Sequence, residues 1–502
     1  MKINILNKKK SYNYILIFIY LLLQIIFIQK IPMIVVDEPW YANTAWNFSV
    51  GNGFVDTAVG SGAGEETFLF PFLLGLSFYF FGVSLLTARM VSVIGGIISI
   101  IGFINIIKVL NIKHKQIVLL SGFLFIFSNV NYIIYRTARP ESWLVAFGVW
   151  SLFFLIKGLK TQDSSSYLFS GLFSSASFLC HPHGALYIFL FGVVVLIQSY
   201  TNKTITPLIY YVIGLVPILL IFLFHITIIR QETIYELFQR WNHRVAIKQD
   251  YFLQAQINNI IAFFHSYSLG IKRVFILIFE LGVLLYGLFF YKKDKYVFMV
   301  SILGLSNFVV GMIFLSPFAT RHFGEILIFS FITFSLLLNY HKGHQKFYKF
   351  IIIVGILYLL NNFAGDMFLI WRDHNKTSYS KIEKKIDEII PDNSNVITLL
   401  EFWFPLKNND TFNSYTRWHK TKYNDLGHFL DSNDLDYVVI SDYFLKGVTP
   451  TSGRQIKETK YLEDKKKYYN SVHSFALSNG VMIDSLITSG YGTIKIWEIK
   501  SE

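Results

Sequence analysis

Long apolar runs dominate the first three quarters of this 502-residue chain and limit what it can fold into. Runs of about 20 apolar residues recur up to residue 370 or so, and this is the length that an α-helix needs to cross a bilayer. Hydrophobic residues make up 53% of the chain and charged residues only 15%, whereas soluble domains carry about 25% charged residues. The pattern predicts a polytopic helical membrane protein and excludes an ordinary soluble enzyme.

The net charge of +13 does not indicate a nucleic-acid partner. From residue 375 onward, 17 basic residues balance 17 acidic ones, so the whole excess lies in the first 374 residues. There the basic residues are dispersed between apolar runs, and such lysines report membrane orientation. The single cysteine, Cys180, excludes an intrachain disulfide and a Cys-rich metal site.

The N-terminus, MKINILNKKK, precedes an apolar run over residues 12–31 that has no small-residue cleavage site. We expect an uncleaved first span with the lysine cluster in the cytoplasm. About 11 crossings are predicted in all, which places the C-terminus outside. The further spans are expected at 86–108, 116–135, 141–159, 166–180, 184–200, 206–229, 269–291, 296–315, 322–340 and 347–370.

The apolar stretch 68–81 decides the topology. If it does not cross, the cytoplasmic segments hold 16 basic residues against two acidic ones, Asp163 and Asp294. This asymmetry is what the positive-inside rule demands. We therefore expect a short helix at the outer surface.

Two domains are expected. Residues 1–374 form a transmembrane catalytic domain with outer loops at about 32–85 and 230–269, and residues 375–502 form a small extracytoplasmic α/β domain. In the tail, 381–390 has helical periodicity and 425–430 is helical, whereas 396–400, 437–441 and 493–499 resemble strands. A tail of this size is long enough for one independent core.

Ionisable residues gather at the outer ends of the predicted spans, where they are costly to place and indicate function. Four groups lie far apart in sequence but on one predicted side of the membrane. Carboxylates in such a group can serve as a general base, and Arg or His can hold a phosphate. The groups are Asp37-Glu38, YRTARPES with Arg139 and Glu141, His181-Pro-His183-Gly184, and Arg321-His322.

These motifs, in this order, resemble the GT-C membrane glycosyltransferases. The branch is that of the protein O-mannosyltransferases (glycosyltransferase family 39) and the lipid A aminoarabinose transferases. The resemblance covers about residues 10–340 and rests on a span followed by DEPWYANTAWN, then FLFPFLLGLSFYFFGVSLLTARMVSVIGG, YRTARPESWLVAFGVW, HPHG and SPFATRHFGEILIFSF.

The resemblance implies the site residues. Asp37 matches the acidic first-loop position that is the family's proposed catalytic base, and Glu38 follows it. Glu141 stands at a second acidic position where members usually carry Asp. As catalytic residues we therefore predict Asp37, Glu38 and Glu141; as substrate-binding residues we predict Arg139, Arg321, His183, Arg89 and His322.

The predicted activity is that of an inverting glycosyltransferase in the cytoplasmic membrane. It would move a sugar from a polyprenyl-phosphate donor to a lipid, glycan or protein acceptor at the outer face. Cationic side chains can neutralise the phosphate, so no cofactor is predicted, although a divalent metal is compatible with this chemistry. Two alternatives are a secondary transporter and a structural membrane subunit whose tail binds a partner; the absence of an internal repeat disfavours the transporter.

Overall fold

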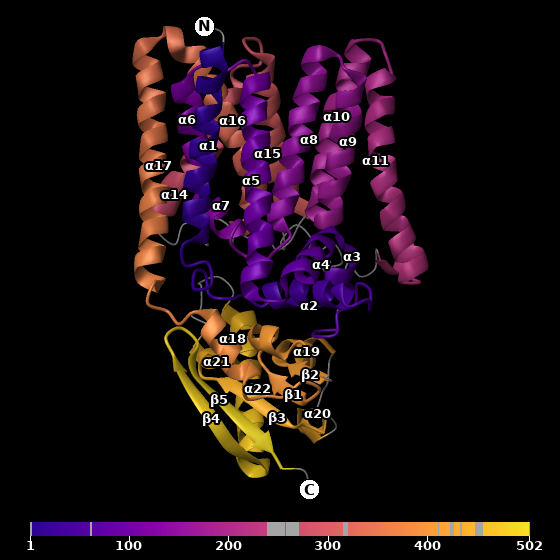
Figure 1. Cartoon of the computed structure of the whole chain (residues 1–502). Helices are drawn as coiled ribbons and strands as arrows, with labels where there is room; N and C mark the ends of the chain where they lie inside the picture. Colours follow the sequence, from indigo (N-terminus) through magenta and orange to yellow (C-terminus); the bar gives the residue numbers. More distant parts are fainter. Residues whose placement is uncertain are drawn as a thin grey trace. The chain divides into compact units, whose positions relative to one another are not determined.

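The computed structural model describes residues 3–60, 63–237, 257, 271–314, 320–409, 411–421, 426–431, 434–446 and 455–500. Contacts within the chain divide it into two compact units (Figure 1). The bundle unit comprises Met1–Ile26, Ser92–Tyr135 and Pro140–Phe368. The loop–tail unit comprises Phe27–Val91, Arg136–Arg139 and Leu369–Glu502. This division differs from the expected boundary at residue 374, because the first outer loop groups with the tail.

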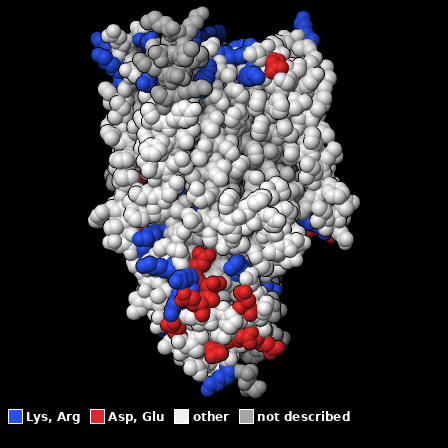
Figure 2. Space-filling model, in the orientation of Figure 1, with Lys and Arg blue, Asp and Glu red and all other residues white. Residues whose placement is uncertain are grey.

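The bundle unit consists of helices that lie side by side (Figure 1). In the view of Figure 2 the lateral surface of the bundle shows few charged side chains, as expected of a surface that faces lipid. The helices that belong to this unit wholly or in large part are α1 (Ile3–Ile25), α5 (Leu85–Val109), α6 (Lys115–Ile126), α7 (Asn129–Ile134), α8 (Glu141–Thr161), α9 (Ser164–Cys180), α10 (Ala185–Thr201), α11 (Thr206–Phe224), α14 (Ile271–Leu288), α15 (Lys295–Phe314), α16 (Gly324–Tyr340) and α17 (Gln345–Asp373), with short segments η1 (Pro182–Gly184), η2 (His225–Ile229), η4 (Thr320–Phe323) and η5 (His341–Gly343).

Seven helices in the described part of the chain are long and apolar enough to cross a membrane, and four more apolar helices are shorter. The chain is thus a multi-pass membrane protein, while the predicted total of about 11 crossings stays a prediction. The seven ranges are Leu85–Val109, Glu141–Thr161, Pro182–Thr201, Thr206–Ile229, Lys295–Ile313, Gly324–Gly343 and Gln345–Asp373.

Helix α9 packs closely against α8 and α11. A Cβ atom placed on Gly171 would lie 2.1 Å from the carbonyl oxygen of Tyr211, and one on Gly214 would lie 2.0 Å from that of Leu168. Only glycine permits the two backbones to approach this closely. Close packing of this kind stabilises helix pairs in a membrane, where the hydrophobic effect does not drive helices together. Several serines line the same helix, and Ser151 of α8 and Ser174 of α9 are 2.6 Å apart.

The first outer loop folds into helices α2 (Asp37–Ser49), α3 (Ala63–Glu66) and α4 (Leu69–Phe81). Helix α4 packs against α2, and Gly75 of α4 lies where a Cβ would meet the carbonyl oxygen of Ala45 at 2.7 Å. At 1.5 Å per residue, the 13 residues of α4 extend only about 20 Å, less than the ~30 Å hydrocarbon core. This length agrees with the expected short surface helix.

The tail builds a mixed five-stranded sheet with the strand order β2-β1-β3-β5-β4. Strand β1 is parallel to β2 and β3, whereas β5 runs antiparallel to β3 and β4. The long helix α22 packs against the sheet through β3, β4 and β5. The strands are β1 (Asn395–Thr398), β2 (Thr411–Ser414), β3 (Tyr437–Ser441), β4 (Gly480–Thr488) and β5 (Gly492–Ile499); the helices are α18 (Tyr379–Asp387), α19 (Tyr415–Thr421), α20 (Leu426–Asp431), α21 (Tyr443–Lys446) and α22 (Gln455–Asn479), with short turns η6 (Leu400–Phe402) and η7 (Phe404–Leu406).

The expected small α/β domain is therefore present, and α18, α20, β1, β3 and β5 fall where the sequence predicts them. Most of the second outer loop predicted at 230–269 lies outside the described residues.

Candidate functional site

The two carboxylates of the first-loop motif begin helix α2, where the partial positive charge of a helix N-terminus favours acidic side chains. Their surroundings differ sharply. The side chain of Glu38 is 0% exposed, whereas that of Asp37 is 32% exposed. Of the pair, only Asp37 is accessible to a substrate.

Glu38 forms a two-pronged ion pair with Arg89, which lies near the start of α5. Arg89 donates from Nε to Oε2 at 2.8 Å and from Nη2 to Oε1 at 2.7 Å. The backbone N–H of Ala138 adds a bond to Oε2 at 2.9 Å, and that of Val35 adds one to Oε1 at 3.2 Å. Both carboxylate oxygens are thus bonded inside the protein.

Arg89 also donates from Nη1 to two carbonyl oxygens of the segment before Asp37. These belong to Ile28 and to Pro32, the latter at 2.9 Å. The buried pair therefore connects three parts of the loop–tail unit: the chain that leaves α1, the start of α5 and the segment Arg136–Arg139. A buried ion pair needs such additional hydrogen bonds to offset its desolvation.

Asp37 pairs with Arg139, whose Nη1 lies 2.6 Å from Oδ2 of Asp37. The side chain of Arg139 is 12% exposed, so the pair is partly accessible. Arg136, three residues earlier, is fully buried. The structure thus brings together Asp37, Glu38, Arg89 and Arg139 from parts of the chain that are far apart in sequence.

The tail contacts the segment that leads to Asp37. The backbone N–H of Ile34 donates to the Tyr491 hydroxyl at 3.0 Å, and that of Tyr379 donates to the carbonyl oxygen of Gln29 at 3.2 Å. The ring of Trp46, in α2, packs edge-on against that of Trp403. Sequence reasoning missed these tail residues, because nothing in the local pattern shows which distant segment a tyrosine will contact.

A second cluster lies in the bundle unit and is almost fully buried. His183 Nδ1 lies 2.9 Å from Oε1 of Glu325, and His322 Nδ1 lies 3.6 Å from the same oxygen. The rings of His183 and His322 have centroids 4.1 Å apart. Glu141, at the start of α8, is buried and interacts electrostatically with His322 and His181.

The predicted residues therefore divide between two clusters, one in each unit, and Pro140 alone separates Arg139 from Glu141 in the chain. Arg321 belongs to η4, but its side chain lies outside the described part of the structure. Glu325 was not predicted as a site residue. Its position one helical turn after His322 was the available signal, because residues three apart lie on one helix face.

The cluster in the bundle can hold a metal ion. One ligand atom each from His183, His322 and Glu325 lie within 4.8 Å of one another. Imidazole nitrogens and a carboxylate oxygen suit zinc and other first-row divalent metals. The cluster around Asp37 has different chemistry: it offers an accessible carboxylate beside a guanidinium, which suits proton transfer next to a phosphate.

Comparisons with known proteins agree with this geometry. Residues 65–228 match the family model described as dolichyl-phosphate-mannose-protein mannosyltransferase. The match does not include the Asp37-Glu38 motif, but it includes Arg89, Arg139, Glu141 and His183. No curated protein matches the chain in sequence.

Solved structures resemble nearly the whole chain. ArnT from Cupriavidus metallidurans in the apo state has a TM-score of 0.62 at 9% identity, over 98% of both chains. ArnT from the same organism bound to undecaprenyl phosphate has a TM-score of 0.60 at 10% identity, over 97% of this chain and 98% of the other.

A third match is the oligosaccharyltransferase of Archaeoglobus fulgidus in complex with Zn and sulfate, with a TM-score of 0.55 at 11% identity. It covers 91% of this chain and 70% of the other. These matches establish the fold. Together with the family-model match, they confirm that the chain resembles the GT-C membrane glycosyltransferases, as its ordered motifs predict.

Proposed function

We propose that this protein transfers a sugar from a polyprenyl-phosphate donor to an acceptor hydroxyl at the outer face of the cytoplasmic membrane. The observation that carries the proposal is the Asp37–Arg139 pair, in which a partly exposed carboxylate lies 2.6 Å from a guanidinium. ArnT, whose fold the chain shares, has been crystallised with undecaprenyl phosphate, which supports a donor of this class. The transporter and the structural subunit leave this arrangement without a role.

Asp37 is the general base in this scheme. The acceptor hydroxyl loses its proton to Asp37 as its oxygen attacks the anomeric carbon. The bond between that carbon and the phosphate oxygen breaks on the opposite face, so the configuration inverts. The polyprenyl phosphate leaves with the electron pair and stays in the membrane.

Arg139 stabilises the leaving phosphate as its negative charge grows. A phosphate contact by Arg321 stays a prediction from the sequence. A guanidinium presents several donors in one plane, so Arg139 can contact a carboxylate and a phosphate together. Glu38 and Arg89, which were predicted as catalytic and substrate-binding, have a different role here. Their buried contacts position the start of α2 and hence Asp37.

The reaction as proposed needs no metal, since arginines neutralise the phosphate. Chelation tests this point: protein treated with EDTA and then freed of chelator should retain its activity. A metal requirement would instead direct attention to His183, His322 and Glu325, where a metal would hold the phosphate or a hydroxyl as a Lewis acid.

The central experiment offers a panel of radiolabelled polyprenyl-phosphate sugars to the purified protein in lipid nanodiscs, with cell-envelope glycolipids as acceptors. We expect transfer from one donor, and a loss of about 10²–10⁴ in rate for Asp37→Asn with donor binding retained. Arg139→Ala should instead weaken donor binding, because it removes a charge-assisted contact.

The matched control is Asp392→Asn, a change of the same type at an exposed tail position. It should leave both rate and donor binding unchanged. Near-wild-type turnover by Asp37→Asn would place the base elsewhere, with Glu141 as the first candidate, and transfer from none of the donors would count against the proposed function.

A further inference from the structure

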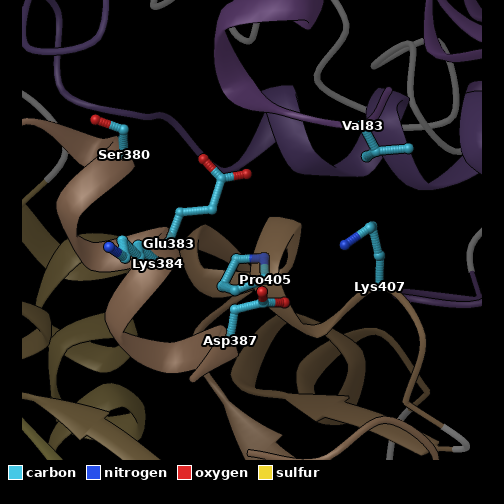
Figure 3. Close-up of a pocket in the computed structure, with 7 residues that line it drawn as sticks. All are labelled: Val83, Ser380, Glu383, Lys384, Asp387, Pro405 and Lys407. Atoms are coloured by element: carbon cyan, nitrogen blue, oxygen red, sulfur yellow. The ribbon is translucent and has the colours of Figure 1, made fainter. Parts of the chain in front are cut away.

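A cleft of about 320 Å³ lies within the loop–tail unit, and none of the residues assigned above lines it (Figure 3). One wall is Val83, in the turn between α4 and α5. The other walls are α18 and the chain around η7. The lining residues are Val83, Ser380, Glu383, Lys384, Asp387, Pro405 and Lys407.

Charged side chains of both signs line this cleft. Figure 3 shows the carboxyl group of Glu383 and the amine of Lys407 directed toward the space between the walls. Both side chains are half-buried. Neither forms a hydrogen bond or an ion pair with any residue that the structure describes, although the charge of Lys407 acts on Glu383. Half-buried groups of opposite charge that stay apart leave room for a polar ligand between them.

The lining restricts the class of ligand. Only Val83 and Pro405 are apolar, too few to hold an acyl chain, and Glu383 and Asp387 repel a free anion. An extended peptide would bind through backbone groups of a strand edge, but none of the residues that line this cleft belongs to a strand. A saccharide fits best, because its many hydroxyls need both donors and acceptors at short range.

The ionisation of Glu383 suits the same ligand. Burial raises the pKa of the Glu383 carboxyl to about 7, even though Lys407 opposes the shift. Near neutral pH this group can therefore accept a hydrogen bond from one hydroxyl or donate one to another. Lys407 and Lys384 donate only, and Asp387 accepts only.

We propose that this cleft binds the saccharide part of the acceptor, so that the acceptor is a glycan. The inference rests on the proposed function. The volume lies at the lower end of the range of ligand clefts, which limits the bound part to a short segment. The cleft would fix the acceptor chain while its reacting hydroxyl reaches Asp37.

Saturation-transfer NMR of the full-length protein in nanodiscs tests the proposal without requiring turnover. The probes are the methyl glycosides of mannose, galactose, glucose and N-acetylglucosamine, with the tripeptide Ala-Ser-Ala as a comparison. We expect at least one glycoside to bind. Its affinity should fall about tenfold or more in the double variant Glu383→Gln/Lys407→Met, which removes two charge-assisted contacts.

Two further variants guard against misfolding and general charge effects. Val83→Trp fills the cleft from the opposite wall and should weaken binding without touching any charge. Glu463→Gln, at an exposed position of α22, should change nothing. If the double variant fails to fold, Val83→Trp alone decides the matter.

Three results would each overturn the inference. Either no glycoside binds, or a glycoside binds but no cleft variant weakens its binding, or the peptide binds in preference to the glycosides. The proposed function is judged separately by donor transfer. If Val83→Trp transfers sugar with an unchanged KM for the acceptor, the cleft does not bind the acceptor, and the proposed function still stands. If the wild-type protein transfers no sugar, the proposed function is refuted, and glycoside binding to the cleft can still be measured.

Discussion

Two adjacent carboxylates, Asp37 and Glu38, lie in different surroundings. Glu38 has both oxygens bonded to Arg89 and to backbone N–H groups, while Asp37 stays partly exposed beside Arg139. The sequence identifies the acidic pair but does not separate its members. Which of two neighbouring side chains is buried depends on what packs over the start of α2, and those groups come from distant segments.

The Glu38–Arg89 pair can be tested as a positioning device. Glu38→Gln leaves a buried guanidinium without its counter-charge, which typically costs about 3–5 kcal/mol. We therefore expect a clear fall in Tm, and a smaller one in the double variant Glu38→Gln/Arg89→Met, since that variant removes both charges. Thermal unfolding in nanodiscs measures both. Unchanged stability in Glu38→Gln with a loss of turnover would instead support the catalytic role predicted for Glu38.

Glu383 should make stability depend on pH. Its folded-state pKa of about 7 exceeds the ordinary value of 4.5, so within this window the folded protein holds a proton that the unfolded chain has lost. Stability therefore falls as pH rises from about 4.5 to 7. Glu383→Gln should match wild type near pH 4.5 and be more stable near pH 8, by roughly 1.4 kcal/mol per pKa unit. Melting curves at both pH values check this, with Glu463→Gln as the control; a uniform shift at all pH values would contradict it.

Among the elements, the predictable ones carry an apolar signature. Strands β1 and β3 are short apolar runs, β5 alternates, and α18 has helical periodicity. Strand β4 was missed because an irregular register between Met482 and Asp484 breaks its alternation and its apolar side chains are largely exposed. Helix α22 was missed because its sequence is mostly polar, and β2 because it has only four residues.

Helix α4 ends in an exposed aromatic group, in which Tyr79, Phe80 and Phe81 are 70–80% exposed. Helix α5, one of the helices long enough to cross a membrane, begins at Leu85, four residues later. Aromatic side chains favour the membrane–water interface, so we expect this tip to insert there. The single cysteine allows a clean test: Phe80→Cys in a Cys180→Ser background is labelled with the fluorophore NBD.

Brominated lipids should quench that label strongly. A label at Lys467→Cys, on α22, provides the matched control and should stay unquenched. Equal quenching at the two sites, or none at Phe80→Cys, would remove the tip from the interface.

For the whole molecule, the contacts that organise the loop–tail unit join residues at long sequence separation. Glu38 bonds to residues 51 and 100 positions away, and Ile34 bonds to a tyrosine 457 positions away. Periodicity in a single sequence predicts local helices and strands, but it does not predict which residues far apart in the sequence contact each other. This is why the sequence predicts the bundle and the α/β tail but does not predict the contacts between the first loop and the tail.

The predicted topology of the chain depends on α4. A helix of 13 residues is shorter than the hydrocarbon core, so we expect the chain to enter α4 and leave it on the same side. With that parity and the predicted total of about 11 crossings, we predict that the lysine-rich connections around Lys113 and Lys293 face the cytoplasm and that the tail faces outward, as the positive-inside rule demands. Alkaline phosphatase, which is active only outside the cytoplasm, should therefore work when fused after Asn375 and fail at Lys113 or Lys293. Green fluorescent protein, which fluoresces only inside, should give the reverse pattern at the same three positions. An active phosphatase at Lys113 together with a dark fluorescent fusion there would mean that α4 crosses the membrane after all.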